Sequence, residues 1–302
     1  MAPGDKVTRP GHVQFGDELL LGPDTPYRWR SLSGWEDLPA LDSGSVNRAD
    51  GHGSYPGRLL AQARTIGLDD VIVRAPHGTI GAVVRALNAA TALGDAEQPL
   101  VIWLDERGPM LSFARVLRRA VPVGNGYRLG TITGAAIQWE ASDPRRYSVI
   151  EQQATTSLPA PEPGLEWQAT PGPERLAYPI DFGAPGSTGT LLALNDGDAP
   201  SHPLVTIRGP VSRPSVTNLR TGEAIEYDID LAADDELLVD TGDGAVTLNR
   251  TASRLYTATA RSVPEQLFAL APSSATTLAF RAAPGSTDRR AAVSIRWRSA
   301  FW

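Results

Sequence analysis

The side chains best suited to bind a metal or to catalyse a reaction are carboxylates concentrated in one stretch of the sequence. Seven carboxylates occur there: Asp228, Asp230, Asp234, Asp235, Glu236, Asp240 and Asp243. Ca²⁺ takes about six to eight oxygen ligands, but no run here follows the D-x-[DN]-x-[DN]-G-x₅-E register of a calcium loop. Aspartate and glycine also suit hairpin turns for backbone reasons. We therefore expect these acids to form turns and to solvate the edge of a hairpin.

Other catalytic constellations have little support. A glycosidase needs one acid kept protonated in an apolar setting, whereas these acids are crowded in a polar stretch. The histidines could converge only in space, because they are far apart in the chain: His12, His52, His77 and His202. No G-x-S-x-G elbow and no phosphate-binding loop ending in Lys-Ser/Thr is present. With no cysteine in the chain, thiol catalysis and zinc-thiolate sites are excluded. The sequence predicts no enzyme, no cofactor and no metal site.

The stretch "SDPRRYSV" is the best candidate for an interface. It presents arginine and tyrosine, which are enriched in binding hot spots, on a proline-containing turn after a strand that ends near Trp139. The candidate interface residues are Asp143, Pro144, Arg145, Arg146 and Tyr147. A solvated turn that closes a domain explains the same residues equally well.

The elements that carry these residues are predicted to be mainly β-strands. The chain of 302 residues has 29 Gly and 25 Pro, and such frequent breaks suit short strands joined by turns. One segment, "GTIGAVVRALNAATALGD", has helical spacing of its apolar residues, with Thr79 as N-cap and Gly94 after the C-terminus. The run "MLSFARVLRRAVPVG" is interpreted as a strand, although its spacing also permits a helix.

A chain of this length favours two domains. The proline-rich stretch 155–173 is typical of a spacer, so we expect an N-terminal domain over 1–154 and a C-terminal domain over 174–302. Strand-like pieces separated by turns predict an antiparallel sandwich in the second half. Two hairpins are expected there, at "NLRTGEAI" and "DTGDGAV". Alternation of Ile295 and Trp297 with arginines predicts that the chain ends in a core strand.

Charge and hydropathy limit the cellular setting. Net charge is −6, and no clustered basic surface for nucleic acid is evident. The longest apolar runs are far shorter than the roughly 20 residues of a membrane helix, so we expect no membrane insertion. The N-terminus lacks the pattern of a secretory signal. We expect synthesis in a cytoplasm.

A series of motifs in the second half resembles the C-terminal domain of siphophage distal tail proteins, the Dit family. The motifs follow the family's order: Asn195, Gly197 and Pro203; Gly209 to Val211 with Pro214 and Asn218; Thr221 to Glu223; Asp240 and Thr241 with Val246 to Asn249. The first half resembles the family's ring domain in its single helix and in a "DP-x-x-Y" turn at Asp143, Pro144 and Tyr147. The closing strand fits the family pattern loosely, with extra residues between Arg296 and Ala300. Residues before about Leu19 and the region 43–57 match nothing in the family.

The resemblance implies a structural protein of a phage tail tip. Family members form a homo-hexameric ring that joins the tail tube protein to the tip hub and carries receptor-binding proteins. The N-terminal domains surround the lumen, and galectin-like sandwiches project outward. Tape measure protein and DNA would be passengers of the lumen only. The expected location is the virion, at the tail tip, after synthesis in the host cytoplasm.

Two other functions remain open at this stage. The C-terminal sandwich could bind carbohydrate directly as an adhesin module of the host surface. Such binding needs exposed aromatic platforms, and outside the last strand only four residues could supply them: Trp167, Tyr178, Tyr227 and Tyr256. A hydrolase is the other alternative, and it lacks a credible nucleophile or acid pair.

Overall fold

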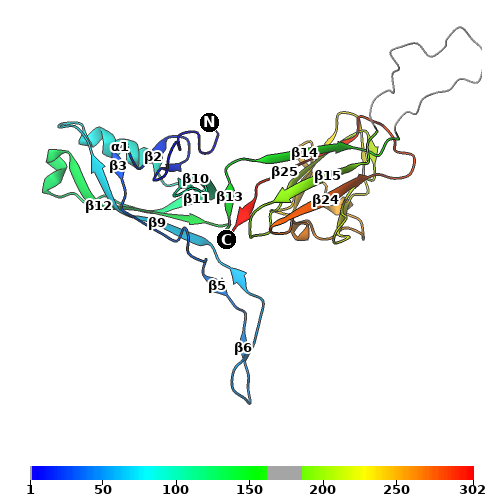
Figure 1. Ribbon diagram of the computed structural model, residues 1–302, viewed down its shortest axis with the longest axis horizontal. Helices are drawn as coiled ribbons and strands as arrows, with labels where there is room; N and C mark the ends of the chain where they lie inside the picture. Colours follow the sequence, from blue (N-terminus) through cyan, green and yellow to red (C-terminus); the bar gives the residue numbers. More distant parts are fainter. Residues whose placement is uncertain (1, 162–185) are drawn as a thin grey trace, which may run out of the picture. The chain divides into compact units, whose positions relative to one another are not determined.

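The computed structural model describes residues 2–161 and 186–302. The chain is mainly β, as predicted, and the described residues include one α-helix, in the N-terminal half (Figure 1). Its internal contacts divide it into two compact units, which we call unit 1 and unit 2. Unit 1 comprises Met1–Val149 together with Ala300–Trp302, and unit 2 comprises Ile150–Ser299.

Unit 1 is built on a ten-stranded antiparallel sheet with the strand order β2-β1-β10-β11-β12-β9-β3, to which β4, β13 and β26 add. The strands of this sheet are β1 (Val13–Phe15), β2 (Leu19–Leu21), β3 (Tyr27–Arg28), β4 (Ser31–Ser33), β9 (Arg64–Arg74), β10 (Gln98–Trp103), β11 (Pro109–Ala120), β12 (Thr131–Ala141), β13 (Arg146–Ser148) and β26 (Ala300–Phe301). A 3₁₀ turn, η1 (Asn125–Leu129), precedes β12.

The core of unit 1 lies between the two ends of this sheet. Phe15 and Leu21 at one end share a buried cluster with Ile66 and Leu68 at the other, so the sheet encloses its core as a sandwich does. Strand β9 alternates buried and exposed side chains because successive residues of a strand face opposite sides. Trp139 on β12 is fully buried, with its ring centre 5.7 Å from that of Phe15.

The predicted helix is present as α1 (Ile80–Ala90), with Thr79 at its N-cap position. The Thr79 hydroxyl does not cap the helix, because it donates to the carbonyl oxygen of Pro76 at 2.9 Å. The helix also ends before Gly94, which corrects the predicted C-terminus. There the Arg119 guanidinium donates to the carbonyl oxygens of Asn88 and Thr91 at 3.0 and 2.9 Å. These bonds satisfy carbonyls at the helix end without a left-handed glycine.

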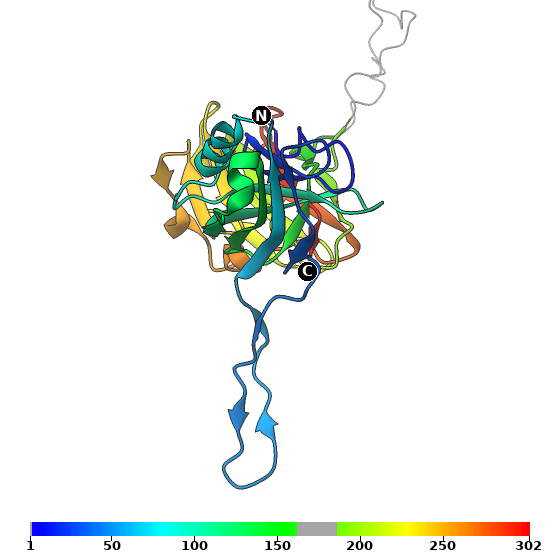
Figure 2. The ribbon, with the colours of Figure 1, turned by 90° about the vertical axis from the view of Figure 1, so that its left-hand side faces the viewer.

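A two-stranded ribbon extends from unit 1, and we call residues 38–62 the arm. Its strands are β5 (Leu41–Asp42), β6 (Val46–Asn47), β7 (Ser54–Tyr55) and β8 (Leu60–Ala61), which pair only as β5 with β8 and β6 with β7. Figures 1 and 2 show the arm standing away from the sheet. Nothing in the sequence predicted this projection.

Unit 2 has two main antiparallel sheets, in the orders β14-β25-β16-β21-β22-β23 and β15-β24-β18-β19, and a small pair β17-β20. Its strands are β14 (Gln152–Ser157), β15 (Thr190–Asn195), β16 (Leu204–Arg208), β17 (Val211–Ser212), β18 (Ser215–Asn218), β19 (Ala224–Glu226), β20 (Asp230–Leu231), β21 (Glu236–Asp240), β22 (Ala245–Leu248), β23 (Ala252–Ser253), β24 (Ser274–Arg281) and β25 (Ala292–Trp297). Two 3₁₀ turns accompany them, η2 (Leu255–Thr257) and η3 (Glu265–Leu267).

Side chains from both main sheets of unit 2 share one core. Val205 and Ile295 come from one sheet, and Val216 and Phe280 from the other, which gives the expected antiparallel sandwich. Both predicted hairpins are confirmed: β18 pairs with β19, and β21 with β22.

The boundaries of the two units differ in detail from the stretches read in the sequence. The predicted spacer of residues 155–173 begins inside β14, which pairs with β25, and from residue 162 it lies outside the described residues. Strand β25 is a core strand, but the chain does not end there. It returns to unit 1, where Ala300 pairs with Tyr147.

Candidate functional site

The turn at Asp143 organises the first part of the candidate interface. Its carboxylate oxygen Oδ1 accepts the Arg145 backbone N–H at 3.1 Å and the Arg145 Nε–H at 2.8 Å. The other oxygen accepts from Arg145 Nη2 at 2.9 Å and from the Tyr147 hydroxyl. Aspartate suits this position because its short side chain bonds to the backbone two residues on. Asp143, Arg145 and Tyr147 therefore form one polar group.

Burial and the Asp143 charge change the pKa values of Tyr147 and Arg145. Burial and the neighbouring Asp143 charge raise the pKa of the Tyr147 hydroxyl, so Tyr147 donates as a neutral phenol. Burial opposes the charge of Arg145, but hydrogen bonds to Asp143 outweigh it and raise the arginine pKa. The Tyr147 ring packs beside the small buried cluster of Val7, Val101 and Leu111.

Arg64, the first residue of β9, is the most deeply buried charge of the site, with 2% of its surface exposed. Its Nε donates to the carbonyl oxygen of Pro144 at 2.6 Å. Its Nη1 donates to three carbonyl oxygens, those of Gly34, Trp35 and Asp37, at 2.8, 3.1 and 2.7 Å. Burial, and then repulsion from Arg146, lower the pKa of Arg64 to about 10. The guanidinium therefore stays charged near neutral pH and joins the 143–147 turn to the loop before the arm.

Arg146 points inward beside Arg64. Its Nη1 donates to Glu36 Oε1 at 2.8 Å, and its Nη2 donates to the carbonyl oxygen of Trp302. The guanidinium carbon lies 5.7 Å from the centre of the Trp35 ring, within the range of a cation–π contact. Arg146 thus joins the last residues of the chain to the same loop.

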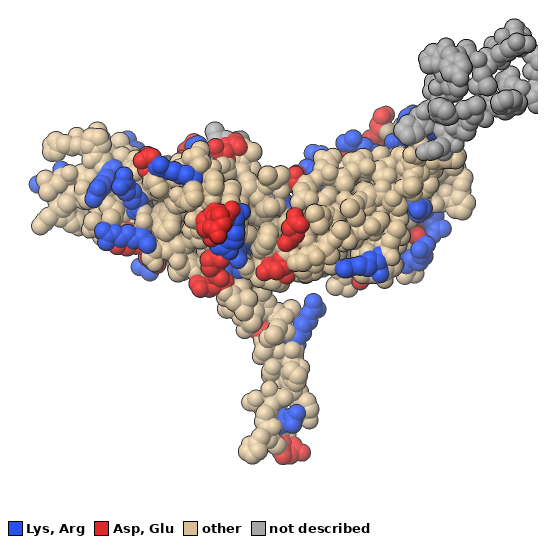
Figure 3. Space-filling model, in the orientation of Figure 1, with Lys and Arg blue, Asp and Glu red and all other residues tan. Residues whose placement is uncertain are grey.

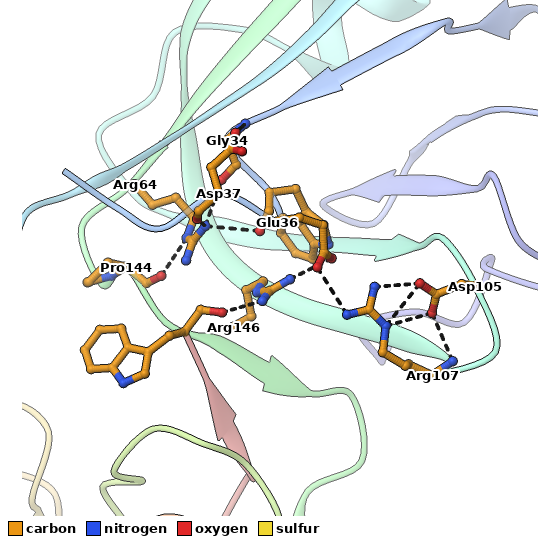
Figure 4. A network of polar contacts seen from close by, with 10 residues as sticks. Gly34, Glu36, Asp37, Arg64, Asp105, Arg107, Pro144 and Arg146 are labelled. Atoms are coloured by element: carbon orange, nitrogen blue, oxygen red, sulfur yellow. Dashed lines mark hydrogen bonds and ion pairs between the residues drawn. The ribbon is translucent and has the colours of Figure 1, made fainter.

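Glu36 continues the network to the surface (Figure 4). Its second oxygen lies 3.1 Å from Arg107 Nη1, and Arg107 in turn donates from Nε to Asp105 Oδ1 at 2.9 Å. Hydrogen bonds from Arg107 lower the pKa of the Asp105 carboxyl to about 2. The network therefore runs from a buried arginine to exposed ion pairs, with each positive charge beside a carboxylate or a set of carbonyls.

The structure thus brings all five predicted interface residues into one region, but most of their polar atoms bond within unit 1. Arg146 and the Pro144 carbonyl face the interior, while Asp143, Arg145 and Tyr147 are half-buried. The paired arginines and carboxylates hold the loops of this region in fixed positions. The role of these residues in an interface stays a prediction.

Sequence reasoning missed Arg64, Trp35 and Glu36. A usable signal existed for Arg64, because it precedes Ile66 and Leu68 with a period of two and so falls on the buried face of its strand. No local pattern indicates Glu36, whose partners Arg107 and Arg146 come from distant parts of the chain.

The acidic stretch of unit 2 does not gather into one site. Asp240 Oδ1 accepts the backbone N–H groups of Gly242 and Asp243 at 2.9 and 3.1 Å, which is turn chemistry. Asp235 accepts from Asn249 Nδ2 at 2.9 Å, and Glu236 lies 3.3 Å from Arg208. Across residues 2–161 and 186–302, no group of three or more His, Cys, Asp or Glu could hold a metal ion. The acids form turns and hairpin contacts, as predicted.

Several motif residues of the second half organise loops. Asn195 is fully buried, and its Nδ2 donates to the carbonyl oxygens of Ala199 and Leu270 at 2.8 and 3.3 Å. Asn218 Oδ1 accepts the Arg220 backbone N–H at 3.0 Å at the start of its hairpin. The Thr241 hydroxyl donates to the carbonyl oxygen of Pro203 at 2.7 Å. The three side chains form hydrogen bonds that hold loops of the sandwich in place, which explains why polar residues stand at these positions.

The surface in the view of Figure 3 shows basic and acidic side chains interspersed on each unit. This face therefore carries no broad field of one sign of the kind that nucleic-acid binding needs. Among the described residues, no helix is long and apolar enough to span a membrane.

Comparison with known proteins gives a family match for part of the chain and a similar fold for nearly all of it. Residues 196–301 match the family described as siphovirus-type tail component, C-terminal domain. The structure of the Dit protein of phage SPP1, described as a paradigm of hub adsorption apparatus in phages that infect Gram-positive bacteria, is similar over 96% of this chain and 99% of its own, with 13% identity and a TM-score of 0.62.

A second similar structure is a chain of the phage P2 baseplate in its activated conformation with Ca, with 11% identity and a TM-score of 0.50 over 94% of this chain and 97% of that one. No curated protein matches the sequence. Residues 196–301 therefore match the siphovirus-type tail component C-terminal domain family, and the chain has the fold of the SPP1 Dit protein, which confirms the resemblance to siphophage distal tail proteins.

Proposed function

We propose that this chain is a structural protein of a long, non-contractile phage tail tip, and that it assembles into a hexameric ring. The observation that carries the proposal is the family match over residues 196–301 within a fold shared along nearly the entire chain with a hub protein. In this role unit 1 continues the tail tube around a lumen. Unit 2, as a galectin-like sandwich, carries the tip hub and receptor-binding proteins. The site of action is the virion.

A structural role agrees with the chemistry of the described residues. The acidic stretch of unit 2 serves turns and hairpin contacts, and Arg64 and Arg146 of unit 1 are held by carbonyl oxygens and a carboxylate. Fixed loops, rather than a reactive group in a cleft, are what an assembly component needs. Tape measure protein and DNA would pass through the lumen without a dedicated site.

A ring imposes a physical condition on unit 1. Copies related by rotation meet through heterologous contacts, in which one patch on each copy binds a different patch on the next. Unit 1 must therefore present two complementary surfaces. The half-buried residues Asp143, Arg145 and Tyr147 remain candidates for a part of one of them.

The alternative of a carbohydrate-binding adhesin has weaker support. Of the aromatic residues available for a sugar platform, Tyr227 is fully buried, and Tyr256 is 78% exposed. Trp167 and Tyr178 lie outside the described residues. A single exposed tyrosine is a poor platform, so we rank this function second.

Mass in solution tests the proposal. Light scattering of the purified protein over a range of concentrations should give a species about six times the 32.2 kDa of one chain. A mass that stays at one chain at every concentration would contradict ring formation by this protein alone.

A further inference from the structure

Arg64 and Arg146 are two buried positive charges that lie beside each other in unit 1. Arg64 is 2% exposed and Arg146 is 6% exposed. The charge of Arg146 is close enough to lower the pKa of Arg64, and Figure 4 shows the two guanidinium groups as neighbours. Two like charges held together away from water repel each other more strongly than they would at the surface, because the interior screens them less.

Each of these guanidinium groups has one nitrogen without a hydrogen-bond acceptor. Arg64 donates from Nε and Nη1 to carbonyl oxygens, and Arg146 donates from Nη1 and Nη2 to Glu36 and Trp302. Arg64 Nη2 and Arg146 Nε remain, and both are buried without a partner among residues 2–161 and 186–302. A buried donor without an acceptor is costly, because it has lost its hydrogen bond to water.

These two nitrogens stand apart from the other buried polar atoms without a partner. In the described part of the chain there are three others, all on uncharged side chains: Ser112 Oγ, Trp139 Nε1 and Thr276 Oγ1. The two arginine nitrogens belong instead to charged groups of one network, and both need an acceptor. One acceptor shared between Arg64 and Arg146 would satisfy both.

The charge of Arg64 is compensated less directly than that of Arg146. Arg146 donates to the Glu36 carboxylate at 2.8 Å, whereas the four acceptors of Arg64 are neutral main-chain carbonyls. Glu36 and Asp37 favour the charged form of Arg64 only through space, and Glu36 is also shared with Arg107. Additional negative charge between Arg64 and Arg146 would therefore be favourable.

We propose that a small inorganic anion of halide size, such as chloride, binds between the guanidinium groups of Arg64 and Arg146. The anion accepts the N–H of Arg64 Nη2 and that of Arg146 Nε, and it offsets the repulsion between the two positive charges. A water molecule could accept the same two N–H groups, but it has no charge to offset that repulsion. Because both side chains are almost fully buried, a small ion suits this position better than a carboxylate or phosphate carried by a larger molecule.

The anion stabilises a point where three segments of unit 1 meet. Arg64 bonds to the loop at Gly34 and to the turn at Pro144, and Arg146 bonds to Trp302 near the end of the chain. A ligand that binds only the folded state stabilises that state as its concentration rises. Chloride should therefore stabilise unit 1 and not unit 2, because each unit has its own core. The site lies within a single chain, so it does not depend on ring formation.

Calorimetry of the full chain in chloride and in gluconate tests the proposal, since gluconate is too large for a buried site of this kind. At constant ionic strength, a rise in chloride from about 1 mM to about 100 mM should raise the unfolding temperature of unit 1 by about 2 °C or more. The transition of unit 2 is the internal control for general salt effects and should stay nearly unchanged. Equal shifts of both transitions, or no shift of unit 1, would overturn the proposal.

Substitutions locate the chloride effect within unit 1. Arg64→Met removes one of the two positive charges and should abolish the chloride-dependent shift. The matched control is Arg119→Ala, which removes another arginine of unit 1 that donates to main-chain carbonyl oxygens. This control should lower the unfolding temperature but keep the chloride-dependent shift. A shift that survives in Arg64→Met would contradict the assignment.

Bromide shows the position of the anion without any substitution, so the test stands even if Arg64→Met does not fold. Crystals of the full chain soaked in bromide should give an anomalous-scattering peak in contact with both Arg64 Nη2 and Arg146 Nε. Bromide peaks found only elsewhere on the molecule, or a water molecule at this position with no anomalous signal, would overturn the proposal.

Discussion

Arg64 holds two loops of unit 1 together. One buried guanidinium satisfies four main-chain carbonyl oxygens from two distant segments. A carbonyl left buried without a donor costs about 1 to 3 kcal/mol, so this side chain couples the turn at Pro144 to the loop at Gly34. Lysine cannot replace it, because a single ammonium lacks the planar set of donors.

We expect Arg64→Met to lower the free energy of unfolding of unit 1 by about 3 kcal/mol or more, since several carbonyls lose their donor at once. Arg64→Lys should recover only part of this loss. The control Arg30→Met removes an exposed ion pair with Asp70 and should cost less than about 1 kcal/mol. Urea denaturation of the three variants measures the difference, and equal losses for Arg64 and Arg30 would contradict the assignment.

Two features of the backbone at position 34 require glycine, its positive φ and the lack of space for a Cβ. Its φ is +75°, and a Cβ at this position would lie 1.9 Å from the Thr65 carbonyl oxygen. Gly78 has a similar φ of +80° but open space around it. We expect Gly78→Ala to cost about 1 to 2 kcal/mol from backbone strain alone, and Gly34→Ala to cost clearly more. Thermal unfolding of both variants checks the ranking.

The Asp105 carboxylate should make the stability of unit 1 depend on pH in the acidic range. Its pKa is held at about 2 by Arg107, below the ordinary value of about 4. A depressed pKa contributes stability that is complete above about pH 4 and is lost as pH falls toward 2. The difference in melting temperature between wild type and Asp105→Asn should therefore shrink between pH 5 and pH 2.5. A difference that stays constant over this range would refute the assignment.

The C-terminal end of α1 is fixed by a side chain from a strand that is distant in the sequence. The prediction placed Gly94 after the last turn, but Arg119 from β11 caps the helix earlier by donating to Asn88 and Thr91. The Thr91 hydroxyl also donates to the Leu87 carbonyl oxygen at 2.6 Å. Local sequence could predict the existence of the helix from its apolar spacing. Its end depends on a side chain from another element, which periodicity does not report.

Arg119→Ala should fray the last turn of α1 and lower stability by about 1.5 to 3 kcal/mol, the usual range for hydrogen bonds to a charged group. Arg118→Ala is the matched control, since Arg118 is an exposed neighbour on the same strand. Amide hydrogen exchange at Thr91, whose N–H donates to the Leu87 carbonyl at 3.0 Å, should speed up only in the first variant. Equal exchange in both variants would show that the cap is not needed.

Other elements were predictable to different degrees for physical reasons. Both hairpins of unit 2 followed from their glycine-containing turns, and the alternation of Ile295 and Trp297 with arginines marked β25 as a core strand. The arm could not be predicted, because its short strands lack a regular alternation and its polar, glycine-rich tip reads as a loop. The candidate turn at 143–147 was found, but its inward bonds to Arg64 and Glu36 depend on tertiary contacts.

At the scale of the whole molecule, the chain begins and ends in the same unit. Ala300 is fully buried in unit 1, and the Trp302 carbonyl accepts from Arg146. We expect deletion of residues 300–302 to lower the unfolding temperature of unit 1 while leaving that of unit 2 nearly unchanged, because each unit has its own core. Calorimetry that resolves the two transitions would check this, and an equal drop in both would contradict it.

The proposed function requires that copies of this chain close into a six-fold ring. Negative-stain electron microscopy of the purified protein measures this most directly, through class averages viewed along the ring axis. We expect closed rings with six equivalent subunits and an open centre. Single particles of one chain, or open chains of variable length at concentrations where light scattering shows assembly, would contradict it.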